Sequence, residues 1–177
     1  MINELFNNNP YVVSDTHFLH NRITQLANRP ANWLELITKD WQDKVLDTDN
    51  VFIGGDMFMS SKSKIRTFMD TYKLKGNIYL LIGNHDGYSN GFYSSLGITA
   101  IRNYIKQDKS EYNALIYKNI IISHIPFVPI PVGYYNLHGH VHNNPFEHKE
   151  STHINMCIEL LNYKLVRFND LVGGIIK

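Results

Sequence analysis

The sequence predicts an α/β protein, because short apolar runs alternate along the chain with longer segments of helical periodicity. Three of these apolar runs stop abruptly at polar residues or glycines, as buried strands do when they lead into a site. The first half therefore predicts a mostly parallel sheet with helices outside it, and the second half predicts another sheet. The 177 residues contain no internal repeat or linker, so we expect one domain over residues 1–177.

The first half has the order strand, helix, strand, helix, strand. Residues 11–13 and 50–53 are apolar runs that predict buried strands, and residues 77–82 predict a third strand. Residues 33–46 place apolar side chains four apart, which predicts an amphipathic helix. Residues 60–73 have a similar apolar side and predict a second helix.

The second half predicts strands rather than helices. Residues 112–117 and 120–123 are expected to form a hairpin, and residues 133–137 and 152–159 predict further strands. Three prolines within residues 126–131 each fix φ and remove a backbone donor, so an extended loop is expected there.

The composition is that of a globular protein, with 44% hydrophobic and 19% charged residues. The formal charge of +1 carries no signature of nucleic-acid binding, and the basic residues within 62–75 predict a solvated helix face. The single Cys157 excludes an intramolecular disulfide and fits a reducing compartment. The first residues do not show the basic-then-apolar pattern of a leader, so none is expected, and no apolar run reaches the roughly 18 residues that a membrane span needs. We therefore expect a cytoplasmic protein without a membrane partner.

Polar side chains that bind metals follow the predicted strands. Asp15 and His17 are two residues apart, so they share one side of an extended chain and can reach the same ion. Asp56 follows two glycines, which allow the backbone to approach an ion closely. Taken singly, such triplets and Gly-Asp steps are ordinary turns. Together with residues 83–86, His124 and residues 139–142, these clusters supply enough ligands for two ions side by side.

The order of these clusters resembles the calcineurin-like metallophosphoesterase superfamily, whose pattern runs Asp-x-His, Gly-Asp, Gly-Asn-His-Asp/Glu, His and Gly-His-x-His. The resemblance covers residues 11–142. Further similarity within residues 14–18, 28–30 and 154–156 resembles the small, uncapped bacterial and phage branch. The resemblance to this superfamily implies a four-layer α/β/β/α sandwich of two mixed β-sheets face to face. The metals would lie at the strand ends along one edge.

The resemblance also implies how the ligands are shared. One ion would be held by Asp15, His17, Asp56 and His142, and the other by Asp56, Asn84, His124 and His140. Asp56 would bridge the two ions, and a bridging hydroxide would attack phosphorus in line with the leaving group. His85 would contact the phosphate or protonate the departing alkoxide as the general acid. The mixed nitrogen and oxygen ligands suit two divalent transition metals, manganese first, with Fe, Zn, Ni or Co as alternatives.

One position departs from the family pattern. Many members carry a second acid three residues after the bridging aspartate, where it orients the histidine that corresponds to His85. This chain has Met59 at that position, and Asp86 is the nearest candidate in sequence for the same task. Without such a group acid catalysis would weaken, and substrates with good leaving groups would suffer least.

Several other side chains are candidates for substrate contacts. Arg22 and Arg29 could clamp a phosphate, because a guanidinium binds phosphate through two hydrogen bonds, although either could form a structural ion pair instead. His20 belongs to a loop that would overhang the metals. Tyr134 and Tyr135 could stack a base or pack in the core. His138 could support the metal ligands or be structural. His148 and His153 are expected at the surface.

These observations predict a metal-dependent phosphoester hydrolase, either a phosphodiesterase or a phosphatase, that acts on a small-molecule or nucleotide-derived ester. Without a cap domain the site should be open, which favours a diester or an extended substrate. A nuclease is the alternative, but it would need a basic, aromatic-lined track that the near-neutral charge does not indicate. A protein phosphatase would need more chain to form its substrate grooves. A non-catalytic scaffold of the same fold would be expected to lack metal ligands or His85, and all are present.

Overall fold

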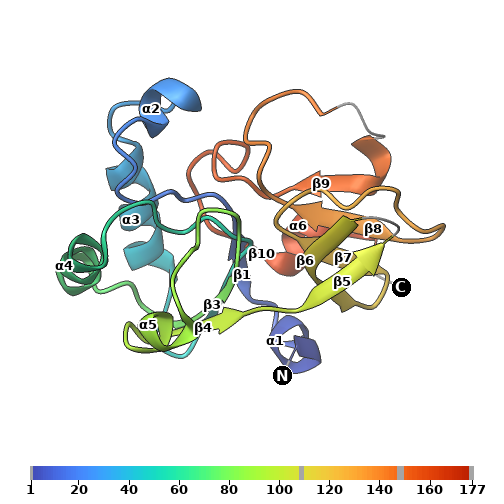
Figure 1. Ribbon diagram of the computed structural model, residues 1–177, viewed down its shortest axis with the longest axis horizontal. Coiled ribbons are helices and arrows are strands. Elements are labelled where there is room, and N and C mark those ends of the chain that lie inside the picture. The colour runs from blue at the N-terminus through green and yellow to red at the C-terminus, as the bar shows by residue number, and fades with distance from the viewer. Residues whose placement is uncertain (1, 108–109, 147–149, 176–177) are drawn as a thin grey trace.

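The computed structural model describes residues 2–107, 110–146 and 150–175, and two five-stranded sheets form its centre (Figure 1). The first sheet has the order β10-β1-β2-β3-β4. Its strands are β1 (Tyr11–Val13), β2 (Asn50–Ile53), β3 (Asn77–Leu81), β4 (Ile98–Ile101) and β10 (Val166–Arg167). Strands β1 to β4 run parallel, and β10 joins β1 in the antiparallel direction.

The second sheet has the order β5-β6-β7-β8-β9. Its strands are β5 (Tyr104–Gln107), β6 (Ser110–Tyr117), β7 (Ile120–Ser123), β8 (Tyr135–His138) and β9 (His153–Asn155). The β5–β6 and β6–β7 pairs are antiparallel, whereas β8 lies parallel to both β7 and β9. Both sheets are therefore mixed, which confirms the fold class that the sequence predicts.

Helices cover the face of the first sheet that points away from the second sheet (Figure 1). These are α3 (Trp33–Lys44), α4 (Lys62–Tyr72) and α5 (Asn90–Ser94). The remaining helical segments are α1 (Ile2–Asn7), α2 (Ile23–Leu26), the single-turn η1 (Glu150–Thr152) and α6 (Phe168–Val172). Of these, α1 and α6 pack into a cluster of apolar side chains that lies between the two sheets. None of the helices in the described part of the chain has the length and apolar character that a membrane crossing requires.

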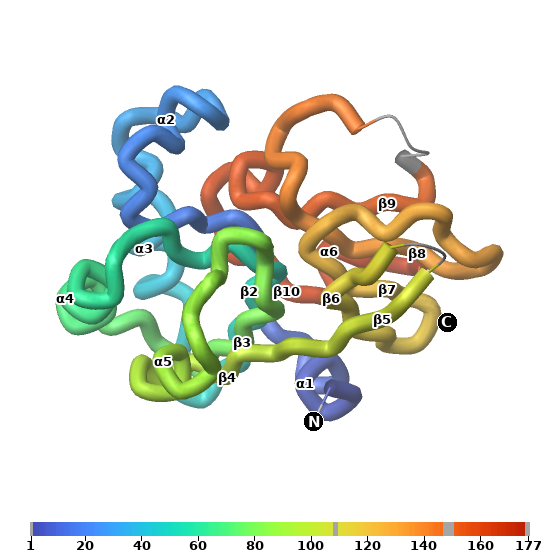
Figure 2. Tube along the Cα trace, in the orientation of Figure 1, coloured from blue at the N-terminus to red at the C-terminus, as the bar shows by residue number. Residues whose placement is uncertain are grey.

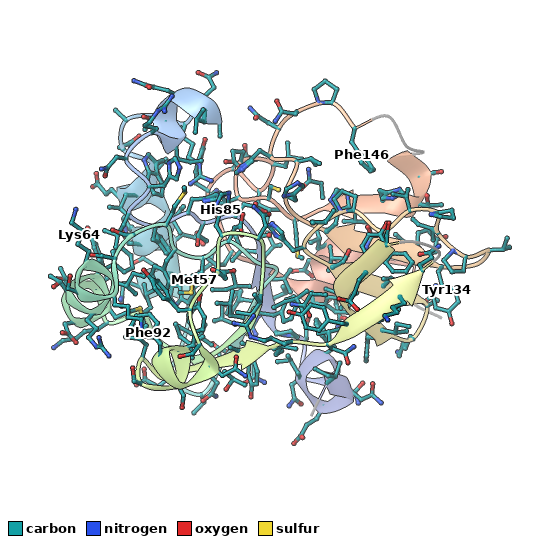
Figure 3. The ribbon with its side chains drawn as sticks, in the orientation of Figure 1. Met57, Lys64, His85, Phe92, Tyr134 and Phe146 are labelled. Carbon is teal, nitrogen blue, oxygen red and sulfur yellow. The ribbon has the colours of Figure 1, made fainter. Side chains whose placement is uncertain are left out.

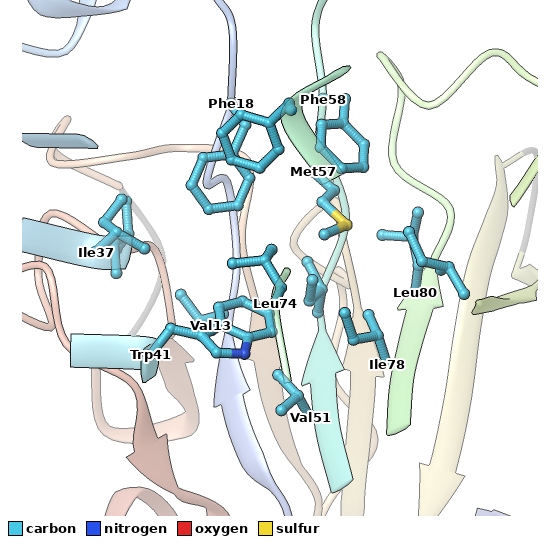
Figure 4. Packing of buried hydrophobic residues seen from close by; sticks show 14 of the residues in the cluster. Val13, Phe18, Ile37, Trp41, Val51, Met57, Phe58, Leu74, Ile78 and Leu80 are labelled. Carbon is cyan, nitrogen blue, oxygen red and sulfur yellow. The ribbon is translucent and has the colours of Figure 1, made fainter. Parts of the chain in front are cut away.

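Alternate residues of the first sheet face two separate apolar clusters. Val51 in β2 packs toward Trp41 of α3, in the cluster between the sheet and its helices (Figure 4). Phe52, the next residue, points the other way and packs with Ile122 and Leu137 of the second sheet. Because successive strand residues point to opposite faces, a sheet that is buried on both faces needs uninterrupted apolar runs. This explains the runs that predict these strands.

The proline-containing loop that follows β7 covers the outer face of the second sheet. Ala114 and Ile121 on that face pack with Phe127 of the loop, and Tyr112 and Tyr134 join them. As predicted, residues 126–131 contain neither helix nor strand, but the strand predicted over residues 133–137 begins only at Tyr135. Tyr134 is thus a packing residue, and Figure 3 places it at the far end of the molecule from His85.

The predicted strand over residues 152–159 is shorter in the structure, where only His153–Asn155 forms β9. The chain then leaves the second sheet because its backbone bonds to the first: Ser14 donates to the Met156 carbonyl at 2.8 Å, and Ile158 donates to the Ser14 carbonyl at 3.1 Å. Figure 2 shows the segment that follows β1 beside the one that follows β9. Two segments far apart in sequence therefore meet at the edge where the strands end.

Candidate metal centre

All seven predicted metal ligands follow the carboxyl ends of strands that lie side by side. Asp15 and His17 come after β1, Asp56 after β2 and Asn84 after β3, while the remaining ligands follow strands of the second sheet: His124 after β7, and His140 and His142 after β8. Parallel strands end at a common edge, so these side chains gather there. In Figure 3, His85 marks this edge between the two halves of the molecule.

The ligands from β1 and β8 form one group. Candidate ligand atoms of Asp15, His17 and His142 all lie within 4.8 Å of one another. The Nε2 atom of His17 lies 3.7 Å from Asp15 Oδ1, and the Nε2 atom of His142 lies 3.9 Å from the same oxygen. These three atoms come from both sheets and could hold one ion between them.

The ligands from β3, β7 and β8 form a second group. The side-chain oxygen of Asn84 lies 2.9 Å from His124 Nε2 and 2.9 Å from His140 Nδ1. Asp56 lies between the groups, because its Oδ2 atom is 3.3 Å from His124 Nε2 and 3.6 Å from His17 Nε2. A carboxylate in that position can contact an ion in either group.

The hydrogen bonds of Asp15 leave one of its oxygens available for a cation. Its Oδ2 atom accepts from Ser14 Oγ at 2.6 Å, from the His140 backbone amide at 2.9 Å and from Cys157 Sγ at 3.2 Å. Its Oδ1 atom is buried and has no hydrogen-bond partner among the described residues. An unpaired buried carboxylate oxygen is costly in a folded protein, so its position opposite two imidazoles fits a metal ligand.

His124 also has an arrangement that calls for a positive charge. Its Nδ1 atom lies 2.9 Å from the Gly54 carbonyl, so Nδ1 carries the proton that it donates there. Its Nε2 atom then faces the oxygens of Asn84 and Asp56, which are both acceptors. Burial lowers the pKa of His124, but the hydrogen bond to Asp56 and the charges of Asp15 and Asp56 raise it to about 9. Either a proton or a metal ion would satisfy these groups.

Both carboxylates of the centre are held in the charged form. Burial by itself raises the pKa of Asp15, but His17 and His124 outweigh this effect and hold the pKa below its ordinary value. Burial likewise opposes the ionisation of Asp56, and the hydrogen bond and charge of His124 lower its pKa overall. The two carboxylates, the amide oxygen of Asn84 and the imidazoles form a mixed oxygen and nitrogen donor set, which suits Mn, Fe, Co, Ni or Zn.

The His142 ring is supported by a buried ion pair. Its Nδ1 atom donates to Glu159 Oε1 at 2.9 Å, and Glu159 also accepts from Arg29 Nε at 2.8 Å. Arg29 donates in addition to the carbonyls of Asp15 and Thr16, at 2.5 and 2.7 Å. The prediction of Arg29 as a phosphate clamp is therefore wrong, because its guanidinium is buried and occupied by groups behind the site.

Asp86 supports the backbone rather than His85. Its Oδ2 atom accepts from the amides of Asp56 and Gly83 at 2.7 and 3.0 Å, and its Oδ1 atom accepts from Met57 at 3.1 Å. Both oxygens are thus bonded to backbone amides, so the suggestion that Asp86 orients the His85 ring is wrong. Gly83 is required by space, because a Cβ atom there would overlap Asp56 Oδ1.

Of the remaining predicted site residues, His85 and His20 lie beside the metal ligands. The His85 side chain is 41% exposed and its Nε2 atom lies 4.0 Å from Asp56 Oδ2, while its backbone amide donates to Asp56 Oδ1 at 2.8 Å. The half-buried His20 ring lies edge-on to the His17 ring, with centroids 5.6 Å apart. Arg22 is exposed at the start of α2, and Met59 is also exposed.

Five of the seven predicted ligands have a left-handed backbone. Their φ angles are 57° at Asp15, 47° at His17, 54° at Asp56, 71° at His140 and 51° at His142. Residues other than glycine adopt this conformation at a cost of roughly 1–3 kcal/mol, and such residues cluster at functional sites. The backbone bends sharply at each strand end and so turns successive side chains toward the same space.

Sequence reasoning missed the groups that hold the ligands in place. Glu159 contacts His142, and Cys157 contacts Asp15. The one available signal was Glu159 itself, a single carboxylate within the otherwise apolar residues 156–161. Two further histidines, His138 and His153, lie against each other outside the ligand groups. His138 is buried with its pKa lowered to about 4 by burial, and its ring lies 5.6 Å from that of His153.

His153 is consequently half-buried rather than a surface residue, which corrects that expectation. His148 lies outside the described residues. Tyr135 is half-buried at the start of β8.

Comparisons with known proteins match most of this chain. A family model described as calcineurin-like phosphoesterase matches residues 10–170. An uncharacterized protein of Methanocaldococcus jannaschii is 31% identical over 174 residues, which cover 92% of this chain and 88% of that protein. The match therefore spans nearly the full length of both chains.

Two solved structures resemble this chain. A protein of unknown function from Aquifex aeolicus superposes with a TM-score of 0.63 at 22% identity, over 90% of this chain and 95% of that chain. A nuclease from Pseudomonas putida gives a TM-score of 0.46 at 18% identity, over 74% of this chain and 60% of that chain. The first likeness shows a shared fold.

Proposed function

Because this chain belongs to the calcineurin-like phosphoesterase family, we propose that it hydrolyses phosphoesters with two divalent transition-metal ions, manganese first among them. The family and the Asp–His clusters indicate metal-dependent phosphoester hydrolysis in general. The number of ions, the metal and the roles of single residues are our proposal.

The proposed ligand sets follow the two groups of side chains. Asp15, His17, Asp56 and His142 would hold one ion, and Asp56, Asn84, His124 and His140 would hold the other. The observation that carries this proposal is the position of Asp56 Oδ2, which lies 3.6 Å from His17 Nε2 and 3.3 Å from His124 Nε2. One carboxylate oxygen between a histidine of each group is what a bridging ligand requires.

The side chains of this site would divide the remaining tasks. Two bound ions would supply a nucleophile by lowering the pKa of water and would neutralise charge on the phosphoryl oxygens. His85, exposed beside Asp56, would contact the phosphate and donate a proton to the departing oxygen as the general acid. His20 and Arg22 would contact the phosphate from the loop that follows β1.

The openness of the site supports a diester or an extended substrate. Asn84, His85 and His140 are all exposed, so a phosphate at the proposed ions could carry a substituent on each side. A phosphomonoesterase, a nuclease and a non-catalytic scaffold remain the alternatives, and substrate choice distinguishes them.

The test is hydrolysis of p-nitrophenyl phosphate and bis-p-nitrophenyl phosphate by protein that has been stripped of metal and reloaded with Mn²⁺. The Asp56→Asn variant is measured beside it, with Asp47→Asn as a control at an exposed carboxylate. We expect metal-dependent turnover that Asp56→Asn abolishes and Asp47→Asn retains, with the diester preferred. A folded protein that binds no transition metal would overturn the proposal. Two bound ions without turnover of either ester would favour the scaffold.

A further inference from the structure

A pocket of about 190 Å³ opens beside the proposed metal centre, between the end of β3, the β5–β6 hairpin and the loop that follows β7. Asn84 and His124, both proposed ligands of the second ion, form part of its wall. A substituent on a phosphate at the proposed ions could therefore reach this pocket. The pocket is a continuation of the site.

The walls of the pocket are largely apolar and aromatic. Tyr104 is 56% exposed and Ile125 is 47% exposed, so two large side chains meet solvent on the pocket side of the centre. Tyr112 also lines the pocket. Its hydroxyl donates to the Val128 carbonyl at 3.1 Å, so the aromatic ring is the part of Tyr112 that is available to a ligand in the pocket. Such surfaces favour a planar, uncharged group that can stack on a tyrosine ring.

Glu111 is the one carboxylate among the described lining residues of the pocket. Glu111 is exposed, and neither lysine nor arginine is among the described residues that line the pocket. Lys106 is the cross-strand partner of Glu111 in the β5–β6 pair, so the charges beside the pocket do not by themselves exclude a further phosphate group. A ring with an amino group would give Glu111 a hydrogen-bond donor, and a bond to a charged acceptor is stronger than one between neutral groups. A plain hydrocarbon ring would leave the carboxylate without this bond.

We propose that this pocket binds the nucleobase of a nucleotide-derived phosphoester, with the base stacked on Tyr104 and an exocyclic amine directed to Glu111. The proposal rests on the proposed function, because it assigns the substrate class of that same site. A base that carries an amine, as adenine does, should bind better than one without it.

The test measures binding of uncharged ligands, so that it does not depend on hydrolysis. Adenosine, purine riboside and ribose are titrated into the full chain by calorimetry, with and without Mn²⁺. We expect adenosine to bind at least about five-fold more tightly than ribose, since stacking on an aromatic side chain contributes about 1–3 kcal/mol per base. Tyr104→Ala should remove this preference and Tyr104→Trp should retain it. Ile116→Ala, an exposed β6 residue outside the pocket, is the matched control and should bind as the wild type does.

Glu111→Gln tests the second contact. The wild type should bind adenosine more tightly than purine riboside, which lacks the amine, and the variant should reduce this difference. Adenosine that binds no more tightly than ribose, or a Tyr104→Ala variant that retains wild-type affinity, would overturn the proposal.

A kinetic comparison separates this proposal from the proposed function. The p-nitrophenyl ester of adenosine 5′-phosphate and methyl p-nitrophenyl phosphate release the same leaving group, so their kcat/KM ratio reports the contribution of the nucleoside. We expect the wild type to favour the adenosine ester and Tyr104→Ala to lose that preference. Hydrolysis of both esters without adenosine binding would refute the pocket alone. Adenosine binding without hydrolysis under any metal would support the pocket and refute the proposed function.

Discussion

Glu159 Oε1 lies 2.9 Å from His142 Nδ1, on the side of the imidazole that faces away from Asp15. This hydrogen bond fixes the proton on Nδ1 and leaves the Nε2 lone pair directed at the proposed ion. Arg29 forms an ion pair with the Glu159 carboxylate and also donates a hydrogen bond to the Asp15 carbonyl. One buried ion pair thus positions a ligand from each sheet.

Glu159→Gln should weaken metal binding, because the amide bonds less strongly to both His142 and Arg29. We expect affinity for Mn²⁺ to fall by roughly ten- to hundred-fold, as is usual when a group that orients a metal ligand is changed. Calorimetric titration of metal-free protein measures the effect, with Glu35→Gln as a control at an exposed glutamate of α3. Equal affinities in the two variants would show that Glu159 only stabilises the fold.

His85→Asn should impair esters with poor leaving groups most. An alkoxide needs a proton as it departs, whereas p-nitrophenolate does not, so removal of a general acid should slow an alkyl ester by roughly 10²-fold or more. The aryl ester should lose much less. The ratio of the kcat values for the two esters, in wild type and variant, measures this. A loss of equal size for both esters would mean that His85 contacts the phosphate without donating a proton.

Gly83→Ala should disrupt the centre even though alanine is the smallest change possible. The added Cβ would overlap Asp56 Oδ1, so Asp56 or the backbone must move, at a cost of about 1–3 kcal/mol in the free energy of unfolding. Gly87→Ala is the matched control, because nothing lies within 4 Å of a Cβ at that position. Urea unfolding and Mn²⁺ titration of both variants test the prediction, and an unaffected Gly83→Ala protein would contradict it.

Raising the pH should destabilise the metal-free protein. The folded-state pKa of His124, about 9, lies above its ordinary value of 6.5. Protonation of His124 therefore stabilises the fold fully below pH 6.5, and this contribution is lost as the pH rises through about 9. Urea unfolding of chelator-treated protein from pH 6 to pH 9.5 measures the decline, which His124→Asn should flatten. A decline of equal size in the variant would assign the effect to other groups.

The sequence was sufficient to predict β1, β2, β3, β6 and β7 and the convergence of the ligand clusters, whereas β4, β5 and β10 were not predicted. Asp15, Asp56 and Asn84 each follow an apolar run, and the ends of parallel strands share one edge, so their meeting follows from topology alone. The limits of β2 and β7 match their predicted ranges, because the residues that bound them are turns.

The support around the ligands could not be predicted, because it depends on contacts between distant residues. Arg29 and Glu159 are 130 residues apart, and no spacing rule connects them. Asp86 is adjacent to His85 in sequence, yet its carboxylate bonds to the amides of Asp56 and Met57. Proximity in the sequence suggested that Asp86 orients the His85 ring. The conformation of the loop instead directs the Asp86 carboxylate to backbone amides.

The left-handed backbone at the ligands of this centre has an evolutionary consequence. Glycine would adopt the φ angles of Asp15, Asp56 and His142 without strain but would supply no side chain. Selection for thermal stability alone would therefore replace these residues, and a lineage released from its function should lose them early. A homologue that has lost its activity should be recognisable by glycine or asparagine at these positions.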